Sequence, residues 1–277
     1  MPSQSRSAET NEFSTLLFEK SNSIGRITLN RPAKRNALSP TMAEELTRLL
    51  QRLEDDREVR VVSIRGAEGQ FCSGGDLAPD EPGAPAREGS AVSITLDMMN
   101  RIYGSLIREL HRFPKPVIAL VEGVAAGAGA NLAFVCDFVY ATPSARFSEI
   151  FVKRGIALDC GGSWILPRLI GLQKAKELAF FGDWIPAEEA HALGLVTTIY
   201  PEATLAEEAE KKLQILAGRP PLALAQIKQS LHRATTVSMN EALEIEAVAQ
   251  AMCTASDDCA EGMLAFMEKR EPVFKGS

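Results

Sequence analysis

The sequence of 277 residues lacks the features that mark several common classes of protein. Its five cysteines are odd in number and include no Cys-x-x-Cys pair, so we expect reduced thiols and neither a zinc site nor a thioredoxin-type motif. No G-x-S-x-G motif is present, which excludes a nucleophile elbow. The longest apolar run, residues 123–136, contains Asn131 and falls well short of the roughly 20 residues that span a membrane. The sequence therefore predicts no membrane segment.

The sequence also has no excess of positive charge. Lys and Arg number 30 against 36 Asp and Glu, and the formal net charge of −6 argues against a nucleic-acid-binding protein. Residues 1–12 are polar and contain no apolar stretch of the kind a secretory signal needs, so we expect a disordered tail and a cytoplasmic protein. The three histidines, His111, His191 and His232, are expected to lie far apart and show no metal-ligand spacing, so no metal site is expected.

What is present is a pattern of strands that alternate with helices. Short apolar or β-branched segments predict an opening hairpin and two buried strands, at residues 13–19, 26–29, 59–64 and 116–121. Ser39 followed by Pro40 predicts the start of an amphipathic helix. From residue 161 the pattern is helical, with a single expected strand at 196–199. We expect an α/β core over residues 13–200 and a helical C-terminal region over residues 201–277.

Two clusters of glycine and alanine each follow a predicted buried strand, at residues 71–77 (FCSGGDL) and 123–130 (GVAAGAGA). Such residues leave backbone N–H groups uncovered at a tight turn. Two turns of this kind can direct two N–H groups at one oxygen atom, which is the arrangement of an oxyanion hole. Neither cluster fits a dinucleotide-binding or Walker A motif.

These clusters and the segment at residues 30–38 (NRPAKRNAL) strongly resemble the three motifs of the crotonase superfamily, the enoyl-CoA hydratases and isomerases. The resemblance covers about residues 13–270. It implies an α/β fold, a spiral of ββα units, with a helical C-terminal region that packs into a homotrimer or a hexamer formed by a dimer of trimers. It also implies an acyl-CoA substrate, with coenzyme A as part of the substrate and no other cofactor. The thioester oxygen would accept backbone hydrogen bonds from Gly75 and Ala128.

The same resemblance implies a set of substrate-binding residues. Lys34 and Arg35 would supply charge to the phosphates of CoA, although a solvated basic turn is the simpler alternative. Phe266 and Lys269 would reach the adenine and phosphates, often across a subunit boundary, unless they only belong to an amphipathic last helix. The remaining residues expected around the substrate are Ala37, Ser73, Gly74, Asp76, Leu77, Ala126, Gly127, Asn131, Phe151 and Leu158.

The chain departs from the hydratases of this superfamily where they carry two glutamates that hold a water. Asn131 and Phe151 occupy those positions, and an amide or a phenyl ring cannot exchange a proton with water. Asp159 is the candidate acid/base, because apolar neighbours would raise its pKa. Its surroundings look most like the isomerase branch of phenylacetate degradation, which acts on ring-epoxide and unsaturated acyl-CoAs. Two alternatives stay open: Asp159 could cap the following helix, and Glu149 could be a second acid near the pocket.

The predicted function is an acyl-CoA thioester isomerase in which Gly75 and Ala128 polarise the carbonyl and Asp159 moves the proton. The nearest alternative is an enoyl-CoA hydratase, in which Asp159 is the lone base and Asn131 orients the water. A third interpretation is a non-catalytic acyl-CoA-binding protein, which the loss of both glutamates would explain. Hydrolase or dehalogenase activity is the least favoured.

Overall fold

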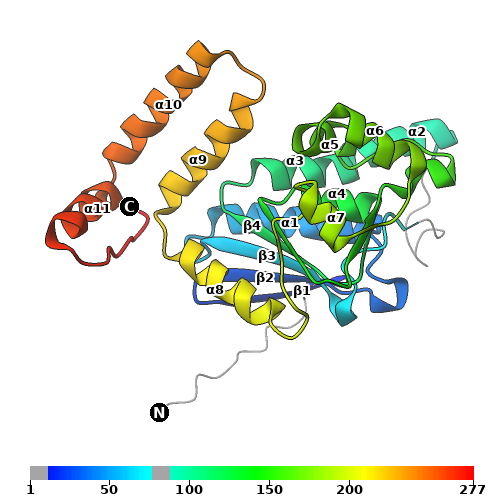
Figure 1. The fold of residues 1–277 in the computed structure, drawn as a ribbon, viewed down its shortest axis with the longest axis horizontal. Coiled ribbons are helices and arrows are strands. Elements are labelled where there is room, and N and C mark those ends of the chain that lie inside the picture. Colours follow the sequence, from blue (N-terminus) through cyan, green and yellow to red (C-terminus); the bar gives the residue numbers. More distant parts are fainter. Residues whose placement is uncertain (1–11, 77–87) are drawn as a thin grey trace.

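The computed structural model describes residues 12–76 and 88–277, and within them the larger sheet has six strands in the order β1-β2-β3-β4-β6-β9 (Figure 1). Leu77 and most of the tail predicted over residues 1–12 lie outside the described residues. The strands are β1 Leu16–Ser21, β2 Ile24–Leu29, β3 Val61–Gly66, β4 Val117–Val121, β6 Phe138–Ala141 and β9 Thr198–Ile199. β1 and β2 form the predicted antiparallel hairpin, and the other neighbouring strands are parallel.

A second sheet joins β5 (Val124–Ala126), β7 (Arg146–Ser148) and β8 (Ile185–Pro186). Two isolated parallel bridges, Leu38 with Gly75 and Cys72 with Ala125, bring the preceding turns of the chain alongside this sheet. After β2, β3, β4 and β6 the chain thus returns through a second layer each time, which is the predicted spiral. β8 contradicts the expectation of a single strand after residue 161. The sequence did not predict this strand, because two residues are too short to show a pattern.

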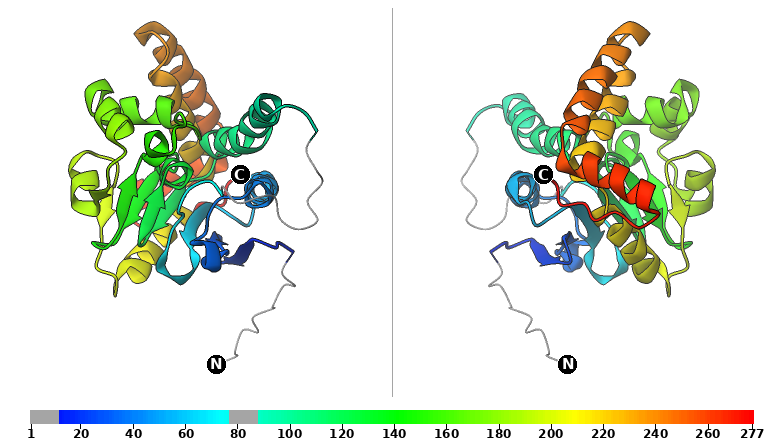
Figure 2. Two further views of the ribbon diagram at one scale, coloured as in Figure 1. Left: turned by 90° about the vertical axis from the view of Figure 1, so that its right-hand side faces the viewer. Right: turned by 90° about the vertical axis from the view of Figure 1, so that its left-hand side faces the viewer.

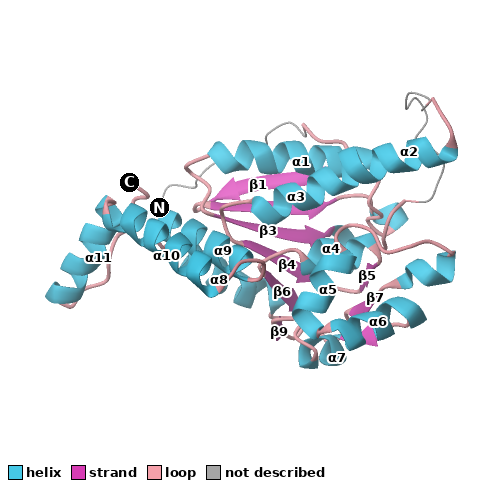
Figure 3. Ribbon diagram, turned by 90° about the horizontal axis from the view of Figure 1, so that it is seen from above, coloured by secondary structure: helices cyan, strands magenta, loops and turns pink. Residues whose placement is uncertain are grey.

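The helices cover both faces of the larger sheet. Their bounds in the described residues are α1 Pro40–Asp55, α2 Ala91–Asp97, α3 Gly104–Arg112, α4 Ala128–Phe134, α5 Gly162–Ile170, α6 Leu172–Phe181, α7 Ala187–Ala192, α8 Leu205–Ala217, α9 Pro221–Ala234, α10 Met239–Thr254 and α11 Asp257–Glu268. A π-helical segment, Met98–Tyr103, joins α2 to α3. α1 begins as predicted, with the Ser39 side chain accepting a hydrogen bond from the Met42 N–H at 3.2 Å. α1 and α3 lie side by side over the sheet (Figure 3).

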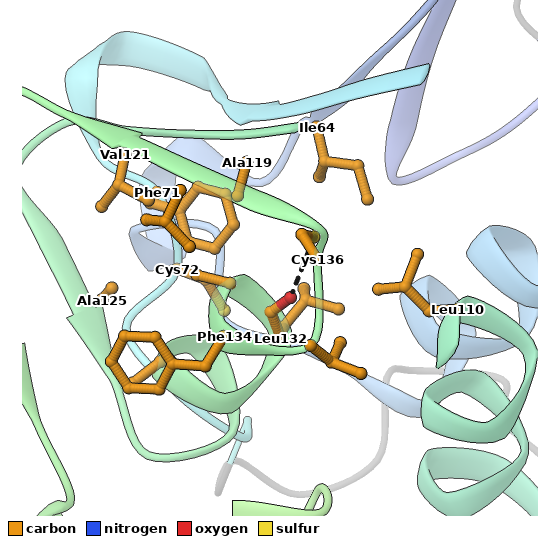
Figure 4. Close-up of a cluster of buried hydrophobic side chains, with 14 of the residues drawn as sticks. Ile64, Phe71, Cys72, Leu110, Ala119, Val121, Ala125, Leu132, Phe134 and Cys136 are labelled. Atoms are coloured by element: carbon orange, nitrogen blue, oxygen red, sulfur yellow. Dashed lines mark hydrogen bonds between the residues drawn. The ribbon is translucent and has the colours of Figure 1, made fainter. Parts of the chain in front are cut away.

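Two apolar cores hold these layers together. The larger core packs α1, α3 and α4 against one face of the sheet, and its part around α4 is shown in Figure 4. There Phe71, Cys72 and Ala125 lie near Leu132 and Phe134, so the turns after β3 and β4 are anchored in the core. The smaller core packs one face of α8 against the opposite face of the sheet.

Helices α9, α10 and α11 project away from the sheets (Figures 1 and 2). They carry many exposed apolar side chains, among them Ile227, Leu231, Met239, Leu243, Val248, Met263 and Phe266. The chain ends beside α11, where the N–H groups of Lys275 and Gly276 donate to the Asp258 carboxylate at 2.7 and 2.9 Å. α8 packs on the sheet, whereas α9–α11 do not belong to this core. The predicted division of the chain into a core and a helical C-terminal region at residue 200 stays a prediction. No helix of the described residues is long and apolar enough to cross a membrane.

Candidate active site

The two small-residue turns lie next to each other, as the sequence predicts. The Cys72 N–H donates to Val124 O at 2.9 Å, and the Ala126 N–H donates back to Cys72 O at 3.0 Å. On the other side of the first turn, the Leu38 N–H donates to Gly74 O at 2.8 Å. Residues 38, 72–75 and 124–126, from three successive passes of the chain, therefore meet at one place.

Glycine is required at two positions of this junction. A Cβ at Gly74, whose φ is +112°, would stand 3.0 Å from Ala126 O. A Cβ at Gly129 would stand 2.3 Å from Cys72 O, closer than real Cβ atoms approach. Any side chain at Gly129 would therefore push the two turns apart.

The N–H groups of Gly75 and Ala128 have no hydrogen-bond acceptor among the described residues. Ala128 is the first residue of α4, and the first N–H groups of a helix have no acceptor within it. The Ala128 residue is only 3% exposed, so its unpaired donor is shielded from bulk water. Two unused main-chain donors on adjacent turns can bind one oxygen atom of a ligand.

The first motif forms a loop that is fixed by its backbone. Asn36 is fully buried, and its side chain accepts from the Arg31 N–H at 2.9 Å and donates to Gln70 O at 2.6 Å. The backbone of Lys34 and Arg35 accepts hydrogen bonds from Ser73, while both of their side chains are exposed. The loop therefore presents two cationic side chains beside the first small-residue turn.

Asp76 and Ala37 both bind the Arg31 guanidinium and so stabilise this loop. The Asp76 carboxylate forms an ion pair with Arg31 at 2.7 Å, and both side chains are largely buried. The Arg31 guanidinium also donates to Ala37 O at 2.7 Å. Asp76 thus holds the loop against the turn through its ion pair, whereas the sequence predicted it beside the substrate.

Asp159 lies between a 3-10 helix, Ile150–Arg154, and α5. Its backbone O accepts from the Gly162 N–H and from the Asn131 amide, both at 3.0 Å. Burial raises the pKa of its carboxyl, against a smaller opposing effect from the Cys160 thiol, which hydrogen-bonds to it. The N-cap of α5 is Gly161, with no capping side chain, so the alternative that Asp159 caps this helix is wrong.

Asn131 and Phe151, at the positions of the hydratase glutamates, both lie at the second turn. Asn131 is fully buried in α4. The Phe151 ring is buried against Gly127, 3.4 Å from where a Cβ at that glycine would stand. Leu158 is half-buried next to Asp159. This part of the predicted set is brought together around the second turn.

Glu149 belongs to the same group, although it was not among the predicted site residues. It is 3% exposed and accepts a long hydrogen bond of 3.4 Å from the Asn131 amide. Burial raises the pKa of the Glu149 carboxyl to about 8, with a further contribution from Asp159. From the sequence, Glu149 was expected only as an alternative, a second acid near the pocket.

Phe266 and Lys269 are not brought to this site within one chain. Phe266 lies on α11 and is 83% exposed, and Lys269 is the C-cap residue directly after α11. α11 lies at the far end of the molecule from α4 (Figure 1).

The expectation that the histidines lie far apart is wrong for two of them. The rings of His111 and His232 stack at 4.2 Å, and His111 also packs edge-on against Trp164 at 5.0 Å. These residues line a cavity of about 460 Å³ where α9 meets the core. No group of side chains in the described ranges could hold a metal ion.

The fold and the paired turns define a spiral α/β protein with two unused main-chain donors on adjacent turns of its described residues, and comparison with known proteins identifies its family. Residues 19–277 match the family model described as enoyl-CoA hydratase/isomerase, and the chain belongs to this family. The crotonase resemblance and the spiral fold are thus confirmed.

Relatives of known name include enzymes of both kinds. The chain is 39% identical to 1,2-epoxyphenylacetyl-CoA isomerase of Escherichia coli, over 90% of this chain and 94% of that protein. It is 34% identical to 2,3-dehydroadipyl-CoA hydratase of E. coli, over 95% and 99% of the two chains. The crystal structure of enoyl-CoA hydratase from Bacillus anthracis matches with a TM-score of 0.88 at 31% identity, over 95% of this chain and all of that one. The reaction must therefore be inferred from this chain's own residues.

Proposed function

We propose that the protein is an acyl-CoA thioester isomerase. The N–H groups of Gly75 and Ala128 bind the thioester oxygen, and Asp159 takes a proton from one carbon of the acyl group and returns it to another. The observation that carries this proposal is the pair of main-chain donors without acceptors on adjacent turns, close to a buried carboxyl.

The chemistry needs both parts. Removal of a proton next to a thioester carbonyl moves negative charge onto its oxygen, and one donor aimed at that oxygen is typically worth about 3 kcal/mol of the barrier. A general base works best when its pKa approaches the working pH, and burial shifts the pKa of Asp159 in that direction.

Isomerisation is favoured over hydration by what surrounds Asp159. The Asn131 amide nitrogen is already committed to Asp159 O and to Glu149, and the amide oxygen that remains can accept a hydrogen bond from a water but cannot take its proton. Phe151 presents an apolar ring where a second base would be needed. The 39% identity to an E. coli epoxyphenylacetyl-CoA isomerase supports the same choice.

We further propose that coenzyme A enters as part of the substrate and that no separate cofactor is needed. Exposed Lys34 and Arg35 would contact its phosphates, while the acyl thioester would lie along Ser73, Gly74, Ala126 and Gly127. The apolar side chains exposed on α9–α11 support assembly into a homotrimer or a pair of trimers, in which Phe266 and Lys269 would reach a neighbouring site. Light scattering, which gives the mass in solution, tests this assembly.

The experiment compares wild type, Asp159→Asn and the control Asp55→Asn, an exposed residue at the end of α1. Each is assayed with a panel of enoyl-, dienoyl- and ring-epoxide CoA thioesters, with products identified by NMR. We expect isomerised products and a fall of about 10² to 10⁴ in rate for Asp159→Asn only. Rapid hydration of crotonyl-CoA, seen as loss of enoyl absorbance, would contradict the isomerase. Binding without turnover of any thioester would indicate the non-catalytic alternative.

A further inference from the structure

Asn131, Glu149 and Asp159 form a buried group whose hydrogen bonding is incomplete. The Asn131 amide nitrogen donates to Asp159 O at 3.0 Å and to Glu149 Oε2 at 3.4 Å. Asn131 Oδ1, Glu149 Oε1 and Asp159 Oδ1 are buried and have no partner among the residues that the structure describes.

All three unpartnered atoms are oxygens. A backbone carbonyl can only accept, so the Asn131 nitrogen must face Asp159 O and its oxygen must be the unpaired atom. With both carboxyls ionised, the group would contain three acceptors in need of a donor, and a buried polar atom without a partner costs free energy. A proton on one carboxyl turns one of these acceptors into a donor for another, and the neutral Cys160 thiol can donate to Asp159.

The surroundings favour Glu149 as the carboxyl that keeps this proton. It is 3% exposed, whereas Asp159 is half-buried. Two neighbouring carboxyls in a low-dielectric site do not both ionise readily, and the more accessible one carries the charge.

Among the residues that the structure describes, no cation contributes to the pKa of Glu149. The Cys160 thiol, which faces both carboxyls, stays neutral because burial raises its pKa. A small cavity of about 10 Å³ on the other side of Glu149 is lined mainly by apolar side chains and by Asp183. Asp183 is itself paired with Lys153 at 2.5 Å. The groups around Glu149 thus add negative or neutral character.

We propose that Glu149 is a positioning residue for the reaction: as a neutral acid it completes the hydrogen bonding of Asn131 and leaves the negative charge of the pair on Asp159. This inference rests on the proposed function, in which Asp159 is the base. Asn131 transmits the effect, because it contacts Glu149 through its side chain and holds the backbone of Asp159.

The proposal has a consequence at alkaline pH. With the pKa of Glu149 at about 8, a rise in pH above that value creates a second negative charge beside Asp159 and removes the donor from the group. Without that donor Asn131 Oδ1 loses its partner, which weakens the hold of Asn131 on the backbone of Asp159. We expect kcat/KM to fall above about pH 8, by about tenfold at pH 9.

The test is the pH profile of Glu149→Gln, which replaces the acid with a neutral side chain that still donates and accepts. Relative to pH 7, the variant should retain about tenfold more of its kcat/KM at pH 9 than wild type does. Glu45→Gln, a buried glutamate in α1 outside the site, is the matched control and should keep the wild-type profile. Identical profiles for wild type and Glu149→Gln would overturn the proposal. A loss of about 10² to 10⁴ at every pH would overturn it too, because it would make Glu149 a proton-transferring group.

A second measurement needs no turnover. Infrared difference spectra between pH 6 and pH 9 should show a protonated carboxylic acid band in substrate-free wild type that is lost at the higher pH and absent from Glu149→Gln. The lack of this band would refute the neutral acid even if the enzyme is an isomerase. Its presence in a protein that turns over no thioester would instead contradict the proposed function alone.

Discussion

Glu45 and Glu149 are both almost fully buried, yet their surroundings have opposite effects on their protonation. The Glu45 carboxylate accepts four hydrogen bonds from the N–H and hydroxyl groups of Ser14 and Thr15, at 2.5 to 2.9 Å. Burial alone would raise the pKa of Glu45, but these hydrogen bonds together outweigh it and lower the pKa. Glu149 has one long hydrogen bond, and its pKa is raised. The number of donors, rather than burial, decides whether a buried carboxyl is charged.

The backbone shows the same contrast. The N–H groups of Ser14 and Thr15 are used within the protein, where they fix the segment before β1 to α1. The N–H groups of Gly75 and Ala128 are unused among the described residues. Backbone N–H groups that have an acceptor within the protein, such as those of Ser14 and Thr15, contribute to its stability. N–H groups without one, such as those of Gly75 and Ala128, are available to a ligand.

The largest effect is expected from Ala128→Pro, which removes an unused donor. Proline is tolerated at the first position of a helix, so α4 should still form. We expect kcat to fall by about 10² to 10³ while the urea unfolding midpoint changes little. Met239→Pro, at the first position of α10, is the matched control and should keep the wild-type kcat. If Ala128→Pro lowered the stability and preserved kcat, the Ala128 N–H would be a donor that serves stability rather than the reaction.

The next effect is on stability and comes from Glu45→Ala. This change leaves the buried donors of Ser14 and Thr15 without their acceptor, and we expect a loss of about 3 kcal/mol in the free energy of unfolding. Glu44→Ala, at the exposed neighbouring position, should change it by no more than about 0.5 kcal/mol. Equal losses in the two variants, measured by denaturant unfolding, would show that the Glu45 hydrogen bonds contribute nothing net.

The most gradual effect is a pH dependence of stability of opposite sign for the two glutamates. The pKa of Glu149 rises from 4.5 to about 8 on folding, so its stabilising neutral form is lost as the pH rises through that range. The stability of Glu149→Gln relative to wild type should therefore increase with pH, by at most about 1.4 kcal/mol per pH unit. The pKa of Glu45 is lowered, so its contribution is present above 4.5 and is lost in acid. The advantage of wild type over Glu45→Gln should shrink as the pH falls below 4.5. Parallel stability curves for all three proteins would contradict both assignments.

Local signals in the sequence predicted much of this structure. Ser39 and Pro40 predicted the start of α1, because capping involves residues only three positions apart. The two glycine clusters predicted adjacent turns, since their small residues are required by the close approach of the backbones. The position of Asp159 near the second turn followed from its resemblance to the family and not from any periodicity.

Contacts between distant, irregular segments were not predictable. Asn131 meets Glu149 and Asp159 across 18 and 28 residues, through side-chain contacts that no strand or helix period encodes. The stack of His111 on His232 depends on where α9 leaves the core, which follows from packing and not from the composition of either helix. The two residues of β8 are paired with β7 by the larger fold, and carry no signal of their own.

The bridge between Cys72 and Ala125 also has a consequence for how the protein is made. The unused N–H groups of Gly75 and Ala128 are 53 positions apart in the sequence, on consecutive turns of the spiral, and come near each other only after the later turn has docked on the earlier one. A nascent chain that has emerged only as far as Val121 already contains Gly75 but lacks the second unused donor. The pair is complete only when the stretch through Gly129 has left the ribosome and packs onto the preceding turn of the spiral.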